Sequence, residues 1–173
     1  MALDLPQVAQ VELARWRDVA TQGRPELRPV PDEQLHVTLV FLGNTPPAEI
    51  DGLWEAVDAA ASGLPAPLLT PLGVKGVPRG RPRLFALDLG DAGHRAGRLH
   101  GGVAEALGRS EERAFWPHVT LTRVRRGAHA STLTVPEAMP FEGFAPSTLT
   151  LYRSQPSTGG ARYTPLRSLA LAP

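Results

Sequence analysis

The tetrapeptide His-Val-Thr-Leu occurs twice in this chain, at residues 36–39 and again at residues 118–121. Side chains alternate between the two faces of a β-strand, so the histidine and threonine of each copy share one face. The valine and leucine share the other face, where they can enter a core. Because the chain has only five histidines, chance is a poor explanation for a repeat of all four letters. The repeat predicts two strands that each present an imidazole and a hydroxyl.

Two such strands could supply acid–base catalysis if they line one cleft. Near neutral pH one imidazole can accept a proton while the other donates one. The hydroxyls of Thr38 and Thr120 could donate hydrogen bonds to oxygens lying between His36 and His118. A phosphodiester suits this arrangement, because its transition state spreads negative charge over several oxygens. The alternative interpretation is a repeated strand sequence with no catalytic role.

Arg123 is a candidate phosphate ligand that the simple alternation does not place. It follows His118 by an odd number of residues, so a flat strand would turn it to the opposite face. A twist, a bulge or a strand end would be needed to bring its guanidinium to the same cleft.

The elements that position these residues follow from periodicity and from Pro and Gly signals. We expect a mixed α+β fold with a largely antiparallel sheet, formed as a single domain over residues 1–173. Helices are predicted from Pro6 to about Ala20, after Asn44 or Thr45, and over the residues that space Leu99, Val103 and Leu107. Strands are predicted at 1–5, 35–43, 113–126, 147–155 and 161–171, with two more in 64–90. Loops or turns are expected at 21–34 and 154–160.

Composition excludes several function classes. The chain has no cysteine, which rules out disulfides, thiolate nucleophiles and cysteine metal sites. It has no apolar run of about 18–20 residues and no signal-peptide pattern at its start, so we expect a cytoplasmic protein without membrane association. We also expect a monomer. The remaining histidines, His94, His100 and His129, are predicted at the surface, and the first two lack the spacing of a helical metal pair.

The positive charge is almost entirely arginine, since Lys75 is the only lysine among the 18 basic residues. A guanidinium can donate two parallel hydrogen bonds to a phosphate. Two groups could guide an RNA backbone or could simply be solvated surface, and both interpretations stay open. They are Arg79, Arg81 and Arg83, and Arg123, Arg125 and Arg126.

Four stretches together resemble a known family: LHVTLVFLG (35–43), FWPHVTLTR (115–123), LYRSQ (151–155) and a late Gly-x-x-x-Tyr at Gly159 and Tyr163. Their order and spacing resemble the 2H phosphoesterase superfamily over essentially the whole chain. Within it, the chain is most similar to the RNA 2′,3′-cyclic phosphodiesterases, also called 2′-5′ RNA ligases. The resemblance implies a bilobal α+β fold with two mainly antiparallel sheets, pseudo-twofold symmetry around a central cleft, and helices on the outside.

The same resemblance implies metal-independent hydrolysis of an RNA or nucleoside 2′,3′-cyclic phosphate to the 2′-phosphate, without a cofactor. His36 would be the proton donor to the departing 3′-oxygen, and His118 the proton acceptor that activates water. From the residues alone the two histidines are interchangeable, because the two copies are identical. Thr38, Thr120 and Arg123 would hold the phosphate.

Two further substrate-binding residues follow from the resemblance. Arg153 would face the cleft, whereas Phe41 could pack against a base or in the core, and the core is the favoured interpretation. Trp116 stands where the family commonly has arginine, which leaves the substrate preference open. Two other activities also stay open: ATP-independent 2′-5′ ligation of RNA such as tRNA halves at the same site, and RNA binding without catalysis.

Overall fold

The computed structural model describes residues 1–109, 114–157 and 160–173. Its helices are α1 (Gln7–Thr21), α2 (Ile50–Ala61) and α3 (Arg95–Ala106), with short 3₁₀ turns at Asp32–Gln34, Pro47–Glu49 and Ala92–His94. Its strands are β1 (Ala2–Asp4), β2 (Leu27–Pro29), β3 (His36–Thr38), β4 (Leu69–Val77), β5 (Leu84–Asp91), β6 (His118–Val124), β7 (Thr148–Ser157) and β8 (Gly160–Ala170).

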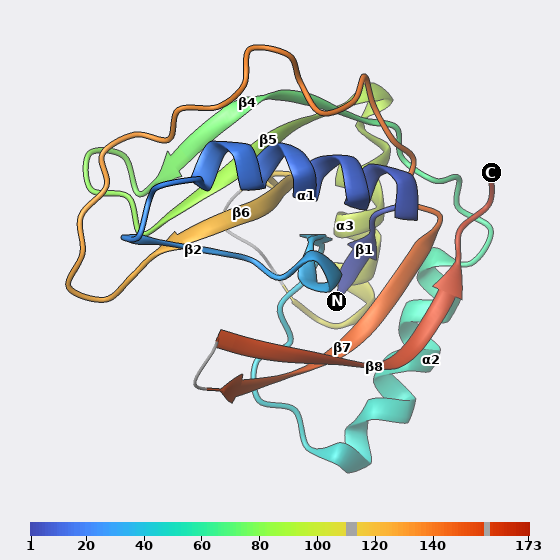
Figure 1. Cartoon of the computed structure of the whole chain (residues 1–173). Coiled ribbons are helices and arrows are strands. Elements are labelled where there is room, and N and C mark those ends of the chain that lie inside the picture. The colour runs from blue at the N-terminus through green and yellow to red at the C-terminus, as the bar shows by residue number, and fades with distance from the viewer. Residues whose placement is uncertain (110–113, 158–159) are drawn as a thin grey trace.

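The strands form an open antiparallel sheet in the order β4-β5-β6-β3-β1-β7-β8, and β2 also pairs with β6. This confirms the expected α+β class with antiparallel pairing. The two expected sheets are the two halves of one continuous sheet, because β3 and β6 pair at its middle, with Val37 opposite Val119. Figure 1 shows the β4–β5 half and the β7–β8 half diverging from this centre.

The repeated tetrapeptides bury the side chains that alternation assigned to the core. Val37, Val119 and Leu121 are fully buried, and Leu39 is nearly so. The same core receives one face of each helix, including Leu13 of α1, Val57 of α2 and Leu99 of α3. Burial of these apolar side chains therefore holds the two motif strands rigidly from behind while their opposite face stays accessible.

The helices pack on different parts of the sheet. α1 contacts β2 and β6, whereas α3 contacts β5 and also packs against α2. Figure 1 shows α1 in front of the upper half of the sheet and α3 behind it. No helix in the described ranges is long and apolar enough to span a membrane.

Several predicted boundaries were wrong. The predicted strand at 113–126 is β6, which begins at His118 and ends at Val124. The predicted loop at 21–34 contains β2, whose pairing with β6 the prolines around it concealed. The predicted strand at 35–43 ends at Thr38. In the predicted turn at 154–160, residues 154–157 belong to β7, residue 160 begins β8, and residues 158–159, with the quoted Gly159, lie outside the described residues. Arg113, at the start of another predicted strand, also lies outside them.

Candidate active site

The pairing of β3 with β6 brings the two motifs together. With Val37 opposite Val119 in an antiparallel pair, His36 lies across from Thr120 and Thr38 lies across from His118. Directly opposed residues of an antiparallel pair point to the same face. All four polar side chains consequently line one cavity of about 360 Å³. The structure thus joins the residues that the repeat singled out.

Both imidazoles are held in the same way by the backbone. The Nδ1 of His36 lies 2.7 Å from the carbonyl oxygen of Gln34, and the Nδ1 of His118 lies 2.9 Å from that of Trp116. A carbonyl can only accept, so each Nδ1 carries a proton and donates it. The Nε2 of each neutral ring is then the atom free to exchange a proton. The Nε2 of His36 lies 3.2 Å from the hydroxyl of Thr38.

A buried or half-buried carboxylate lies across the sheet from each histidine. Asp4 of β1 is opposite His36, and Asp88 of β5 is opposite His118. Asp4 accepts hydrogen bonds from the Tyr152 hydroxyl at 2.8 Å and from the Thr150 hydroxyl at 2.5 Å. These donors orient the carboxylate, and the repeat of Asp beside His extends the pseudo-symmetry beyond the tetrapeptides.

Asp88 is held by different partners. It accepts a hydrogen bond from the Trp116 Nε1 at 2.5 Å and forms an ion pair with Lys75, also at 2.5 Å. Trp116 in turn stacks on His118, with ring centroids 4.0 Å apart and planes inclined by 15°. The indole therefore links the carboxylate to one face of the imidazole.

His36 lies between two tyrosines. Its ring centroid is 5.2 Å from that of Tyr163, in an edge-to-face contact, and 6.3 Å from that of Tyr152. Burial and the hydrogen bond to Asp4 raise the pKa of Tyr152 above its usual range, so its hydroxyl remains a donor. Each histidine is thus flanked by an aromatic ring whose polar atom holds the neighbouring aspartate.

Burial lowers the pKa of His36, because the charged imidazolium loses water. The hydrogen bond to Gln34 and the charge of Asp4 oppose this effect, whereas electrostatic repulsion from the nearby chain N-terminus and His118 adds to it. In the unliganded protein His36 is therefore biased toward its neutral form.

Arg123 reaches the same cavity because the β5–β6 pair is irregular. Phe85 pairs with Thr122 while the next residue, Ala86, pairs with Thr120, which leaves Leu121 as an extra residue. Leu121 and Thr122 are both buried, and the alternation is shifted so that Arg123 lines the cavity. Of the three irregularities that could bring Arg123 to the cavity, a twist, a bulge or a strand end, the structure has the bulge, and bulges of this kind re-aim side chains.

Comparisons with known proteins identify relatives of this chain. A family model described as "LigT like Phosphoesterase" matches residues 3–84, which include the first motif. The chain is 32% identical to the RNA 2′,3′-cyclic phosphodiesterase of Escherichia coli (strain K12) over 98% of its own length and 94% of the relative's. It is also 32% identical to a Thermus thermophilus protein of the same name, covering 98% of this chain and 88% of that one.

The chain belongs to the LigT-like phosphoesterase family. The crystal structure of E. coli LigT complexed with 3′-AMP superposes with a TM-score of 0.76 at 30% identity, covering 99% of this chain and 96% of that one. The match to the family model ends at residue 84, before the second motif. The matches to the two relatives cover 98% of this chain and so include both motifs.

Phe41 and Arg153 occupy the outer part of this LigT-like site. Phe41 is 76% exposed, so the favoured core interpretation was wrong; β3 ends at Thr38, and strand alternation no longer sets the direction of Phe41. It lines both the cavity with the four motif side chains and a neighbouring cavity of about 520 Å³. Arg153 lines only the neighbouring cavity, beside Tyr152 and Tyr163.

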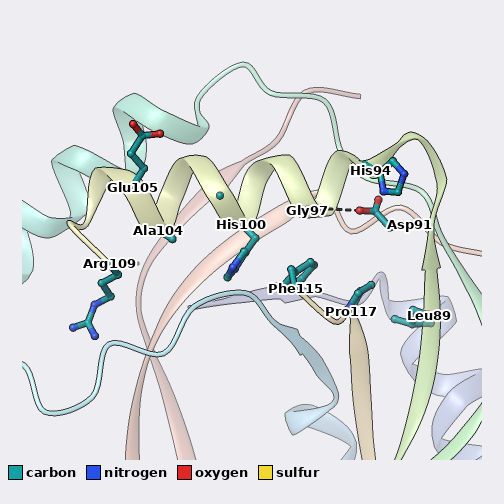
Figure 2. Close-up of a pocket in the computed structure, with 11 residues that line it drawn as sticks. Leu89, Asp91, His94, Gly97, His100, Ala104, Glu105, Arg109, Phe115 and Pro117 are labelled. Atoms are coloured by element: carbon teal, nitrogen blue, oxygen red, sulfur yellow. Dashed lines mark hydrogen bonds between the residues drawn. The ribbon is translucent and has the colours of Figure 1, made fainter. Parts of the chain in front are cut away.

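A separate hollow of about 590 Å³ lies along α3 and contains none of the four motif side chains. Figure 2 shows His100 pointing from α3 toward the chain beneath it, next to Phe115. His100 is buried, its Nδ1 lies 2.8 Å from the Leu39 carbonyl oxygen, and its ring stacks on Phe115 at 4.6 Å. The surface prediction for His100 was wrong, because this ring fastens α3 to the end of the first motif.

The rest of that hollow is explained by local structure. Asp91 accepts hydrogen bonds from the backbone N–H groups of Ala96 at 3.0 Å and Gly97 at 2.8 Å, and so caps the first turn of α3. Figure 2 shows the second of these bonds. Among the residues that the structure describes, no group of three or more His, Asp or Glu side chains could hold a metal ion.

Sequence reasoning missed Asp4 and Asp88 as partners of the histidines. A sequence signal for both was present. Each is the acidic residue of a tetrapeptide Ala-Leu-Asp-Leu that occurs twice, at residues 2–5 and 86–89. This second repeated tetrapeptide lies on the strands β1 and β5, which flank the two motif strands. A search for further repeats would have found it.

Proposed function

We propose that this chain hydrolyses 2′,3′-cyclic phosphates of RNA ends or nucleosides to 2′-phosphates. The observation that carries the proposal is one cavity lined by His36, Thr38, His118 and Thr120, in which the Nδ1 of each histidine is bonded to a backbone carbonyl and its Nε2 is left to exchange a proton. The activity named for the E. coli and T. thermophilus relatives supports it.

In the proposed reaction His118 accepts a proton from water while the water oxygen attacks phosphorus. The bond from phosphorus to the 3′-oxygen breaks, and protonated His36 donates its proton to that oxygen. The product carries a 2′-phosphate and a 3′-hydroxyl. Because attack and departure occur on opposite sides of phosphorus, the mechanism needs the acid and the base on opposite sides of the phosphate, a placement that two separate strands can provide.

Thr38, Thr120 and Arg123 stabilise the charge on the phosphate in this mechanism. The two hydroxyls donate to non-bridging oxygens, and the guanidinium adds a charge-assisted hydrogen bond. Phe41, exposed at the cavity mouth, offers a flat surface on which a nucleobase can stack. Arg153 contacts the substrate farther from phosphorus.

A lowered pKa disfavours the protonated form that a proton donor needs, so His36 can act as the donor only if substrate binding raises its pKa. A phosphodiester places a negative charge beside the imidazole, and an opposite charge within a few ångströms favours the imidazolium. Substrate binding therefore restores the proton that burial disfavours in the free protein. Asp4, across the sheet from His36, contributes in the same direction.

The test is incubation with the four nucleoside 2′,3′-cyclic phosphates and identification of the products by ³¹P NMR. We expect 2′-phosphates. A 3′-phosphate product would show that the 2′-oxygen leaves, and would overturn the assigned leaving group. No turnover of any substrate, combined with RNA binding, would replace hydrolysis with a non-catalytic binding function.

Ligation uses the same steps with a 5′-hydroxyl in place of water. A second arm therefore adds an RNA with a 5′-hydroxyl end to one with a 2′,3′-cyclic phosphate end, without ATP. A joined product that alkali cleaves but that resists a ribonuclease specific for 3′-5′ linkages would identify a 2′-5′ linkage made at this site.

A further inference from the structure

A groove of about 900 Å³ lined by six arginines adjoins the cavity of the four motif side chains. These arginines are Arg28, Arg81, Arg83, Arg123, Arg125 and Arg126, and we call this surface the arginine groove. Arg28 and Arg123 line both the groove and the catalytic cavity. The two spaces therefore meet at these two side chains.

Three segments that are distant in sequence build the groove. β2 pairs with β6, which places Arg28 opposite Arg123. The N–H of Val124 donates to the carbonyl of Arg83, and the N–H of Arg125 donates to that of Glu26, both at 2.9 Å. Figure 1 shows β2, the turn between β4 and β5, and the chain that follows β6 together at the same end of the sheet.

The charges in the groove are unbalanced. Within residues 1–109, 114–157 and 160–173, no acidic residue lines it and no ion pair joins its arginines to a carboxylate. The nearby Glu26 pairs instead with Arg24, at 2.5 Å. Six guanidinium groups gathered without counter-charges repel one another, and this repulsion is relieved when anions bind.

We propose that the arginine groove binds the phosphate backbone of the RNA strand that precedes the 2′,3′-cyclic phosphate, so that the preferred substrate is an RNA chain rather than a mononucleotide. This inference rests on the proposed function. The catalytic cavity takes the terminal nucleotide, and the next phosphates lie along the arginines. Guanidinium groups suit this task because they contact phosphate oxygens in pairs and read no base sequence.

The test compares 2′,3′-cyclic AMP with an RNA octamer that ends in a 2′,3′-cyclic phosphate. The variant is Arg81→Gln/Arg83→Gln/Arg126→Gln, which spares Arg28 and Arg123 of the catalytic cavity and Arg125, whose Nε donates to the Pro25 carbonyl. We expect the variant's kcat/KM for the octamer to fall about tenfold or more, while its kcat/KM for 2′,3′-cyclic AMP stays within about twofold of the unmodified protein's value. The slope of log kcat/KM against log salt should decrease by roughly two, about 0.7 for each lost contact to a single strand.

The matched control is Arg15→Gln/Arg98→Gln/Arg167→Gln, which changes the net charge equally at residues outside the groove and the catalytic cavity. It should leave both substrates unaffected. An equal loss of kcat/KM on the two substrates, or an equal loss in the control variant, would overturn the proposal that the arginine groove binds RNA. If neither substrate is hydrolysed, the proposed function fails. Fluorescence anisotropy with a labelled octamer ending in a 3′-phosphate then tests RNA binding by the groove alone. An unchanged affinity in the Arg81, Arg83 and Arg126 variant would overturn the proposed RNA binding.

Discussion

Trp116 lies flat against His118, with ring centroids 4.0 Å apart, and the same indole donates its N–H to Asp88. His118 is thereby held on one face by stacking and at Nδ1 by the Trp116 carbonyl. Lys75 completes the group by pairing with Asp88 and lying 5.8 Å from the indole centroid. The imidazole expected to activate water is therefore oriented by a rigid chain of neighbours.

Replacing Trp116 tests this orientation. Trp116→Leu removes the stacking and the bond to Asp88, and should reduce kcat by roughly 10- to 70-fold, since an aromatic pair contributes about 0.5–1.5 kcal/mol and a hydrogen bond about 1 kcal/mol. Trp116→Phe keeps a ring and should recover part of this loss. The ¹⁵N NMR signals of His118 should broaden in the leucine variant, a change that a loss of stability alone would not produce.

The histidines themselves should have the largest effects. His36→Ala and His118→Ala should each lower kcat by roughly 10²–10⁴-fold, the usual contribution of a positioned acid or base. The unfolding midpoint should change little, because neither ring belongs to the buried apolar core. His129→Ala, an exposed histidine outside the cavity, is the control and should retain full activity. Undiminished turnover in either catalytic variant would remove that residue from the mechanism.

The pH profile should differ between the free and the bound protein. Burial lowers the pKa of His36, so in the free protein its acidic form is lost at a pH below the ordinary value of about 6.5. Because the bound phosphate favours the imidazolium, the alkaline limb of kcat should lie at a higher pH than that of kcat/KM. Rate measurements from pH 5 to 9 decide this, and limbs that coincide would contradict it.

The threonine hydroxyls should contribute as hydrogen-bond donors. Thr38→Val or Thr120→Val keeps the branched shape but removes the hydroxyl, and should lower kcat/KM about 10- to 100-fold, consistent with about 1.5–3 kcal/mol for a hydrogen bond to a charged group. Thr→Ser at the same positions keeps the donor and should restore most of the activity. Steady-state rates with 2′,3′-cyclic AMP measure these effects. Equal losses in the valine and serine variants would show that the threonine contributes by packing and not by its hydrogen bond.

His100 should matter for stability rather than for catalysis. His100→Leu leaves the Leu39 carbonyl without the donor that His100 supplies, which costs about 1–3 kcal/mol for a buried group. The expected fall in Tm is roughly 2–4 °C per kcal/mol for a chain of this size. Thermal unfolding followed by circular dichroism measures it. An unchanged Tm would mean that this contact does not anchor α3.

The sequence by itself determined the two motif strands and the faces on which their histidines and threonines lie. Alternation along a strand is a local property, and buried valines and leucines enforce it wherever the strand is placed. The odd spacing of Arg123 likewise pointed to an irregular strand, and the bulge at Leu121 supplies it.

Only the tertiary structure decided what surrounds those residues. The register that sets Val37 opposite Val119, the pairing of β2 with β6, the partners of Asp4 and Asp88, and the burial of His100 all join segments far apart in the chain. Such contacts depend on how elements pack together, and no periodicity within one segment encodes them. Two identical tetrapeptides thus became two differently surrounded histidines, because one side of the sheet contributes tyrosines and the other contributes Trp116 and Lys75.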